Sequence, residues 1–436
     1  MFALVTTILM LTSTVSSAPK SPICDVTKDP DIKFVDIRLT KTKVPPILTS
    51  YVCQAQPIPL AMDVAYHAVA FEPIIENKDV VHHMLLFGCE KSVSEDPHAC
   101  SGSDNVCRTF LVQWSMGIQG QICSHPDTGV RFGQDSLHSL SLQIHYNNAK
   151  LAAGLADSSG VRVYYTTRLR KYDAGNVQIG QNDLQIPPGV AAFPQYGFCS
   201  SDCTNKWLQQ PIYLTRAHIH MHYVGDGGRL ELVRNGQTVE TIINDTTTFD
   251  YNNPPAHYFS DPVQVLPGDS LKVTCYYNTR DGGKYRNSTV YWDEGSSGEM
   301  CYAFITYFPR VPDFDQCIQF DVYDICSSHG GLVGGCSFGG FARSFKNILA
   351  ESILSHCSLP STNQNVSTSV VQQKADGLDL RILCSPSCEE AIQQMTGHPC
   401  MQNRVGSHMR RVYLAAVDSW QAVKVIIDTA AKHCAD

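Results

Sequence analysis

The chain has 436 residues, of which 43% are hydrophobic and 17% are charged, a composition that excludes a disordered chain and predicts folded globular domains. Its formal net charge of -8, with no basic run, argues against nucleic acid as a partner. At this length two or three domains are expected, because one hydrophobic core rarely serves so many residues.

The N-terminus carries an apolar segment, MFALVTTILMLTSTVSSAPK, with small residues near Ser16–Ala18. This pattern predicts a cleaved secretory signal over residues 1–18. No later run approaches the roughly 20 apolar residues that a membrane helix needs. We therefore expect no stable insertion into a membrane.

Eighteen cysteines indicate disulfide bonds, because oxidising compartments preserve them and the cytosol does not. Three glycosylation sequons, at Asn244, Asn287 and Asn365, are compatible with the same compartment. The predicted location is outside the cell or in the lumen of a secretory vesicle.

From about Cys24 to Cys317 the sequence consists of short β-type runs separated by Gly, Pro, Asn and Asp turns. Runs of this kind occupy residues 140–147, 160–170, 212–224, 228–236 and 270–279. Regularly spaced short strands predict a mainly β fold with antiparallel sandwiches. We place one domain at residues 19–170 and a second at residues 171–325.

After Cys317 a Gly-rich loop leads into two amphipathic helical patterns, at residues 341–357 and 410–434. Residues 326–436 are predicted to form a small Cys-rich α-helical extension, which could support oligomerisation. Its cysteines are Cys326, Cys336, Cys357, Cys384, Cys388, Cys400 and Cys434.

Two adjacent histidines, His82 and His83, head the apolar run VVHHMLLFGC. Adjacent imidazoles compete for space and for hydrogen-bond partners, so a metal site is a candidate. In a regular strand the two side chains point to opposite faces, so joint coordination needs a bend, a strand end or the use of different ring nitrogens. His145, in LQIHYNN, offers a third imidazole, although its spacing fits a structural residue equally well.

A second cluster, AHIHMHYVG, places His218, His220 and His222 at alternate positions. If this is a strand, its period of two puts all three on one face, where they could share a metal ion. The alternative is an exposed polar face. Imidazoles suit copper, zinc and iron, whereas a thioether suits Cu(I). Ten methionines are present, and composition alone does not select Met300 as such a ligand.

These motifs together resemble the type II, ascorbate-dependent copper monooxygenases, which include dopamine β-hydroxylase and peptidylglycine α-hydroxylating monooxygenase. The likeness spans roughly residues 24–317 and leans toward the dopamine β-hydroxylase branch. Met221 departs from the family pattern, which has Thr between the paired histidines. The matching positions are His82, His83, Met84, Phe87 and Cys89 in the first signature, and His220, His222 and Gly225 in the second.

The resemblance implies two antiparallel, jelly-roll-like sandwich domains that face a cleft, each with one copper ion. Ascorbate would be the reductant, O2 the co-substrate and a small molecule the substrate. The implied first-copper ligands are His82, His83 and His145, and the implied second-copper ligands, at the catalytic site, are His220, His222 and Met300. The implied disulfides are Cys53–Cys100, Cys89–Cys107, Cys199–Cys317 and Cys275–Cys301, with Cys24, Cys123 and Cys203 unassigned.

The substrate is less constrained by the resemblance. The peptide-amidating branch holds a substrate carboxylate with an Arg, an Asn and a Tyr, whose positions here are His218, Tyr302 and Phe304. A peptide C-terminus would lack its anchor. We expect hydroxylation of a C–H bond in a small, aromatic, amine-like substrate, with these three residues as substrate candidates, although Tyr302 and Phe304 fit core packing equally well.

Three alternatives stand beside a secreted copper monooxygenase. One is a peptidylglycine-type enzyme with altered substrate anchoring, and another is a non-catalytic extracellular copper-binding protein. The third is a zinc hydrolase with a three-histidine site and an open position. The soft thioether of Met300 argues against zinc.

Overall fold

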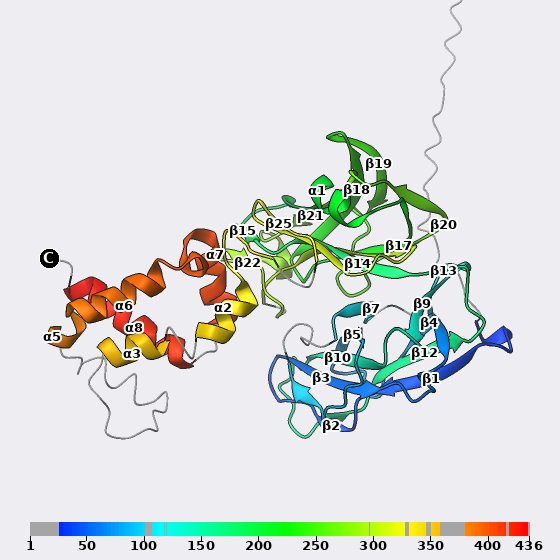
Figure 1. Cartoon of the computed structure of the whole chain (residues 1–436), viewed down its shortest axis with the longest axis horizontal. Coiled ribbons are helices and arrows are strands. Elements are labelled where there is room, and N and C mark those ends of the chain that lie inside the picture. Colours follow the sequence, from blue (N-terminus) through cyan, green and yellow to red (C-terminus); the bar gives the residue numbers. More distant parts are fainter. Residues whose placement is uncertain are drawn as a thin grey trace, which may run out of the picture.

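The computed structural model describes residues 26–100, 107–116, 118, 120–295, 297–327, 331–345, 350–357, 380–415 and 418–434. The predicted signal segment, Cys24 and the sequon at Asn365 lie outside these residues. Two β-sandwiches face each other, and a helical extension projects from the second (Figure 1). The expected mainly β fold with a disulfide-rich helical C-terminal region is confirmed.

The first sandwich consists of two mostly antiparallel sheets that bury one apolar core between them. Its outer sheet has the order β1 (Lys33–Arg38), β12 (Gly160–Thr166), β4 (Ala65–Ile74), β9 (Thr128–Gly133) and β13 (Tyr172–Asp173), with β8 (Ile122–Cys123) paired to β4. Its inner sheet has the order β6 (His98–Ala99), β3 (Thr49–Pro57), β10 (Ser139–Asn147), β5 (Val81–Cys89) and β7 (Thr109–Ser115). A small ribbon pairs β2 (Thr42–Lys43) with β11 (Ala156–Asp157), and a 3-10 turn, η1, covers Val26–Lys28.

The second sandwich has the same two-layer form and its own core. Its inner sheet has the order β20 (Ala256–Val265), β17 (Ile212–His220), β23 (Cys301–Phe308), β14 (Gly175–Gln181), β24 (Gln316–Phe320) and β25 (Tyr323–Ile325). Its outer sheet has the order β16 (Phe193–Cys199), β21 (Ser270–Tyr277), β18 (Gly225–Arg234) and β19 (Gln237–Asn244). Smaller elements are β15 (Gln185–Ile186) paired with β22 (Val290–Tyr291), helix α1 (Ser201–Trp207) and η2 (Gly282–Lys284).

The two inner sheets meet along a seam between the sandwiches. Asn176 of β14 donates its amide protons to the carbonyl oxygens of Phe110 and Leu111 in β7, both at 3.1 Å. Phe110 also packs against Phe304, with ring centroids 4.9 Å apart. Polar and aromatic contacts therefore join the two sandwiches directly.

The helical extension has its own core, which also includes Phe320 of the second sandwich. Ser385 caps helix α6 by accepting a hydrogen bond from the backbone of Cys388, and Pro386 suits the first turn because its missing N–H would have no partner there. In the described residues, no helix is both long enough and apolar enough to cross a membrane. The elements are α2 (Phe338–Ser344), α3 (Glu351–Cys357), α5 (Leu380–Leu383), α6 (Pro386–Thr396), η5 (Pro399–Met401), α7 (Asn403–His408), the π-helical η6 (Met409–Tyr413) and α8 (Asp418–His433).

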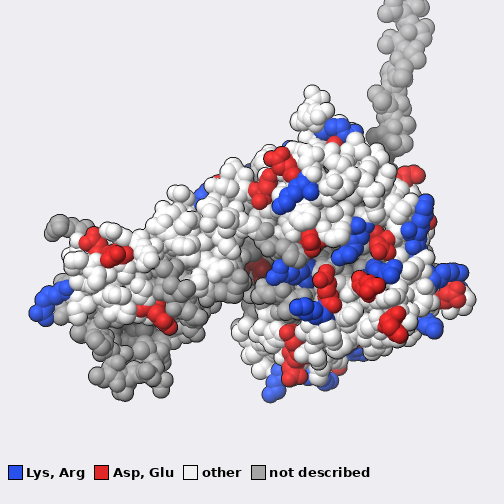
Figure 2. Space-filling model, viewed as in Figure 1, with Lys and Arg blue, Asp and Glu red and all other residues white. Residues whose placement is uncertain are grey.

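The surface charge is mixed. On the face drawn in Figure 2, basic and acidic side chains are interspersed over the two sandwiches. Several form exposed pairs, such as Arg168 with Asp29 at 3.0 Å and Lys41 with Glu76 at 3.2 Å. Pairs of this kind contribute little to stability.

Replacing Asn176 by Asp should weaken the seam, because a carboxylate cannot donate to the two carbonyl oxygens and repels them instead. We expect a loss of about 3 kcal/mol in the free energy of unfolding, measured by urea denaturation. Asn253→Asp, at an exposed position, is the matched control and should change stability by less than about 0.5 kcal/mol. Equal stability of the two variants would contradict the assigned role of Asn176.

Candidate metal centres

The first histidine group is built by a β-bulge in the inner sheet of the first sandwich. His145 in β10 lies directly opposite His83 in β5, but the next residue, Tyr146, pairs with Val81. His82 is therefore the extra residue of the bulge. This irregularity removes the strict alternation that would send His82 and His83 to opposite faces, and it meets the geometric condition for joint coordination.

Three ring nitrogens converge at this point. The Nδ1 atoms of His82 and His83 are 3.3 Å apart, and those of His83 and His145 are 3.2 Å apart. A metal ion bound about 2.0 Å from two nitrogens at a near-tetrahedral angle holds them about 3.3 Å apart. The spacing of the three imidazoles therefore fits a metal ion such as copper.

Thr49 contacts one imidazole of this group, that of His145. Its hydroxyl oxygen lies 2.6 Å from Nε2 of His145. A proton on Nε2 that is donated to this oxygen leaves the lone pair on Nδ1 free for a metal. Tyr51, opposite His145 in β3, stacks on the same ring with centroids 4.5 Å apart and fixes its plane.

Burial keeps these imidazoles neutral. It lowers the pKa of His82 to about 4 and that of His145 to about 3, and neighbouring histidines add to both effects. His83 is also buried, and its pKa lies well below the usual value for the same reasons. Neutral rings present lone pairs to a cation without a competing proton.

The second histidine group lies at the end of β17. His220 is the last residue of that strand, and His222 follows it, so the three alternating histidines do not all belong to one regular strand. The carboxylate of Glu299 accepts hydrogen bonds from the backbone N–H groups of His222 and Val224, both at 2.7 Å. These hydrogen bonds replace the backbone hydrogen bonds that a continuation of β17 would have made with a neighbouring strand.

His222 and Met300 are held by the same short segment. Nδ1–H of His222 donates to the carbonyl oxygen of Gly298 at 3.0 Å, which leaves the lone pair of Nε2 free for a metal. The backbone N–H of Met300 also donates to the Glu299 carboxylate, at 3.2 Å. Burial raises the pKa of Glu299 to about 8, and the backbone hydrogen bonds oppose this shift. One carboxylate thus ties the backbone beside both residues.

His218 has a different environment. Its Nε2 lies 3.3 Å from the amide oxygen of Gln113, a residue of the first sandwich, and its ring stacks on Phe304. The amide nitrogen of Gln113 lies 3.3 Å from Nδ1 of His220. Gln113 therefore links both histidines across the seam and leaves Nε2 of His220 for a metal.

The two histidine groups lie close together across the seam. The rings of His83 and His220 have centroids 6.3 Å apart. Tyr251 of the second sandwich packs against His82 at 5.0 Å and lies 6.5 Å from His222. The imidazoles of both sandwiches therefore form one aromatic cluster.

The remaining substrate candidates are buried. The Tyr302 hydroxyl bonds to the side chain of Asn182 and accepts from the indole N–H of Trp292 at 2.7 Å. Tyr302 and Phe304 are 3% and 7% exposed, and His218 is 2% exposed. A substrate could reach these side chains only if the seam opened, and their roles stay predictions.

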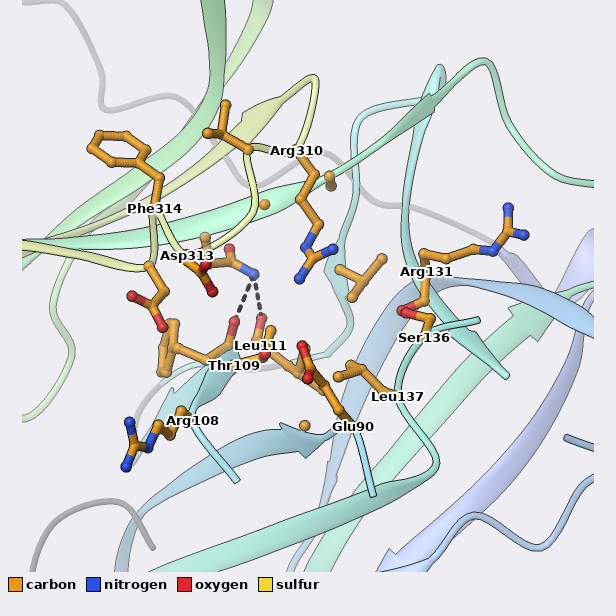
Figure 3. A pocket seen from close by; sticks show the side chains of 18 of the residues that line it. Glu90, Arg108, Thr109, Leu111, Arg131, Ser136, Leu137, Arg310, Asp313 and Phe314 are labelled. Carbon is orange, nitrogen blue, oxygen red and sulfur yellow. Dashed lines mark hydrogen bonds between the residues drawn. The ribbon is translucent and has the colours of Figure 1, made fainter. Parts of the chain in front are cut away.

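A cavity of about 270 Å³ lies elsewhere on the seam, and none of the six histidines at positions 82, 83, 145, 218, 220 and 222 lines it. Charged and polar residues of both sandwiches surround it, and Figure 3 shows Arg310 directed toward its interior, beside the hydrogen bonds from the Asn176 side chain to β7. Its lining includes Glu90, Arg108, Arg131, Arg310 and Asp313.

Comparison with known families agrees with this arrangement. Residues 35–153 match the family model "Copper type II ascorbate-dependent monooxygenase, N-terminal domain". Residues 172–326 match the corresponding C-terminal domain. The chain belongs to the copper type II ascorbate-dependent monooxygenase family. Copper and ascorbate are the cofactors of this family, as the resemblance implied.

Similar members of the family include human DBH-like monooxygenase protein 1, at 30% identity over 66% of this chain and 50% of that protein. Mouse DBH-like monooxygenase protein 2 is 31% identical over 65% of this chain and 47% of that protein. Bovine dopamine beta-hydroxylase is 31% identical over 64% of this chain and 47% of that protein. The chain spans about half the length of these curated relatives.

The structure contains the four disulfides that the family resemblance implied. They are Cys53–Cys100, Cys89–Cys107, Cys199–Cys317 and Cys275–Cys301. Cys203, unassigned from the sequence, pairs with Cys326, and the extension holds Cys336–Cys400, Cys357–Cys388 and Cys384–Cys434. Cys123 is also disulfide-bonded. Asn244 and Asn287 are exposed.

Four residues of the site were not identified from the sequence. Glu299 had a usable signal, because a carboxylate directly precedes the candidate ligand Met300 in GEMC. Thr49 could have been suspected only after β3 was aligned beside His145. Gln113 and Tyr251 carry no sequence signal, because each acts across the seam.

Thr49→Val should weaken metal binding at the first histidine group, because the valine keeps the shape but removes the partner of His145 Nε2. We expect the Cu(I) affinity of this group to fall by about 10- to 100-fold in a competition titration with a chromogenic chelator. Thr49→Ser keeps the hydroxyl and should bind nearly as tightly as the unaltered protein. Equal affinities for all three proteins would rule out this role.

The metal-free protein should lose stability as the pH falls from about 6.5 toward 4. The lowered pKa values of His82 and His145 mean that the unfolded chain takes up protons in this range while the folded chain does not. Above pH 6.5 both histidines are neutral in the folded and in the unfolded chain, so protonation does not reduce the free energy of unfolding there. Thermal unfolding at a series of pH values measures this, and His145→Asn should give a shallower pH dependence.

Proposed function

We propose that this protein is a secreted copper- and ascorbate-dependent monooxygenase that hydroxylates a C–H bond of a small, aromatic, amine-like substrate with O2. The observation that carries the proposal is the convergence of the Nδ1 atoms of His82, His83 and His145 in the first sandwich, where the ring centroid of His83 lies 6.3 Å from that of His220 in the second. Family membership supplies the class of reaction.

Each histidine group has a distinct part in the proposal. His82, His83 and His145 would hold one copper ion, and His220, His222 and Met300 would hold the other. Copper at these positions would supply one-electron redox chemistry for the reductive use of O2, with ascorbate as the source of the electrons. The thioether at the second position favours Cu(I).

The residues around the ligands orient them and exclude water. Thr49 and the carbonyl of Gly298 each accept a ring proton, which fixes the nitrogen that faces the metal. Gln113 and Tyr251 cover the histidines from the opposite sandwich. Burial keeps bulk water from the reacting atoms, which limits the loss of reducing equivalents to side reactions.

The proposed substrate class rests on what surrounds the second group. His218 stands where the peptide-amidating branch would hold a substrate carboxylate, and it is neutral, because burial and the nearby Arg216 keep its pKa well below the usual value. A neutral ring bonded to Gln113 provides no cation for a peptide C-terminus. Phe110 and Phe304 border the same region and favour an aromatic group.

The proposed location is outside the cell or in the vesicle lumen. Disulfides throughout the described chain support an oxidising compartment. Exposed Asn244 and Asn287 are accessible to glycosylation. The domain limits at residues 170 and 325 and a role of the extension in oligomerisation belong to the same proposal.

The test is oxygen consumption by copper-loaded protein with ascorbate, measured against phenethylamines, catecholamines and glycine-extended peptides. Met300→Ile should lower the rate by more than the roughly 100-fold that loss of an outer-shell partner can cause, since it removes a ligand but keeps an apolar side chain. Met62→Ile, in the first sandwich, is the matched control and should retain activity.

Other outcomes would contradict the proposal. Full activity of Met300→Ile would remove Met300 from the site. Turnover of peptides but not of amines would assign the peptidylglycine type. Copper binding without turnover of any substrate would favour a binding protein, and bound zinc with no copper would favour a hydrolase.

A further inference from the structure

The helical extension contacts the second sandwich beside the segment that leads to Met300. Arg404 of α7 forms an ion pair with Asp183 at 2.6 Å, and the side chain of Asp183 is 3% exposed. The guanidinium of Arg411 lies 4.1 Å from the ring centre of Tyr291. His408 packs against Trp292 with ring centroids 5.4 Å apart. Three side chains of the extension thus reach β22 and its surroundings.

Two of the contacted residues, Tyr291 and Trp292, are directly joined to Glu299. Trp292 forms an isolated β-bridge with Glu299. The backbone N–H of Glu299 donates to the carbonyl of Tyr291 at 2.9 Å, and that of Asp293 donates to the carbonyl of Glu299 at 3.2 Å. Any displacement of Tyr291 and Trp292 must therefore move Glu299.

Glu299 in turn holds the second histidine group. Its carboxylate accepts from the backbone of His222 and Val224, and from Met300. It is 1% exposed, so these bonds have no competition from bulk water. A shift of the Glu299 backbone would alter the separation of His222 and Met300.

A second route joins the extension to the same region. Trp292, which is 6% exposed beneath His408, donates its indole N–H to Tyr302, and the Tyr302 hydroxyl bonds to Asn182. Asn182 directly precedes Asp183, the partner of Arg404. Tyr302 of β23 therefore connects the contact of His408 with Trp292 to the contact of Arg404 with Asp183.

We propose that the helical extension is a positioning element for the second metal site: Arg404, His408 and Arg411 hold the segment on which Glu299 and Met300 lie. Outer-shell contacts of this kind fix the orientation of ligands. The family match ends at residue 326, so the extension adds an element outside the matched domains. The identity of the ligands rests on the proposed function.

The network also accounts for the burial of one carboxylate, Asp183, and one indole, Trp292. Asp183 is a buried carboxylate whose pKa is raised by burial, and the Arg404 guanidinium opposes that shift. Without the extension this carboxylate would lose its cation, and Trp292 would be exposed to water. The second sandwich is therefore shaped to receive the extension.

The test compares two double variants of the full-length protein. Arg404→Gln with Arg411→Gln removes the two cations that contact the second sandwich. Arg381→Gln with Arg410→Gln removes the same charge from the extension but not from this interface, since Arg381 is exposed in α5 and Arg410 bonds within the extension to Met401 and Ser407. The single variant Arg411→Gln removes only the cation over Tyr291 and keeps the ion pair of Arg404, so it perturbs the interface less.

Two readouts separate positioning from general stability. Hydrogen exchange of the metal-free protein should accelerate about tenfold at the amides of His222, Val224 and Met300 in the first double variant, and not in the control. The Cu(I) affinity of the second site should fall about tenfold, with a weaker sulfur contribution to X-ray absorption, while the first site binds as before.

The proposal is overturned if exchange at these amides and the second-site affinity match the control. It is also overturned if both copper sites weaken equally, since that result indicates general destabilisation. If the unaltered protein binds no copper, the proposed function fails, while the exchange measurement still decides whether the extension holds the Glu299 segment.

Discussion

Both candidate metal centres depend on five buried imidazoles that burial keeps neutral, so that each can present one nitrogen to a metal. Burial removes the protonated form, because a charged ring in a low-dielectric seam is costly. Hydrogen bonds then select the tautomer: Thr49 for His145 and the Gly298 carbonyl for His222. Neither sandwich could provide this alone, since Gln113 and Tyr251 reach the histidines from the opposite partner. The seam is thus part of the site.

Much of the fold followed from strand periodicity. The predicted run at residues 140–147 is β10, and the run at residues 270–279 contains β21. Periodicity could not predict where a strand contains a bulge or where it ends. The bulge at His82 and the end of β17 at His220 both depend on contacts between distant segments, and both decide which nitrogens converge. Local pattern predicts regular strands, whereas the candidate ligands His82 and His222 lie at irregular positions.

The extension illustrates a second limit. Its cysteines predicted a stapled helical unit, and the helices at α3 and α8 agree with the apolar spacing. The six cysteines that pair within the extension could form fifteen different sets of disulfides, however, and their spacing does not choose among them. Its attachment through Arg404 and Asp183 joins residues more than two hundred positions apart, and nothing in either local sequence indicates it. Such contacts can be identified only from the three-dimensional structure.

The passage between the sandwiches is very short. Strand β13 ends at Asp173 and β14 begins at Gly175, so Ala174 alone separates them, and this residue lines the seam cavity from which the histidines are absent. Within the described residues the chain crosses between the sandwiches at this point. Any rearrangement of the two sandwiches must therefore keep them joined at Ala174, a buried residue with no slack on either side.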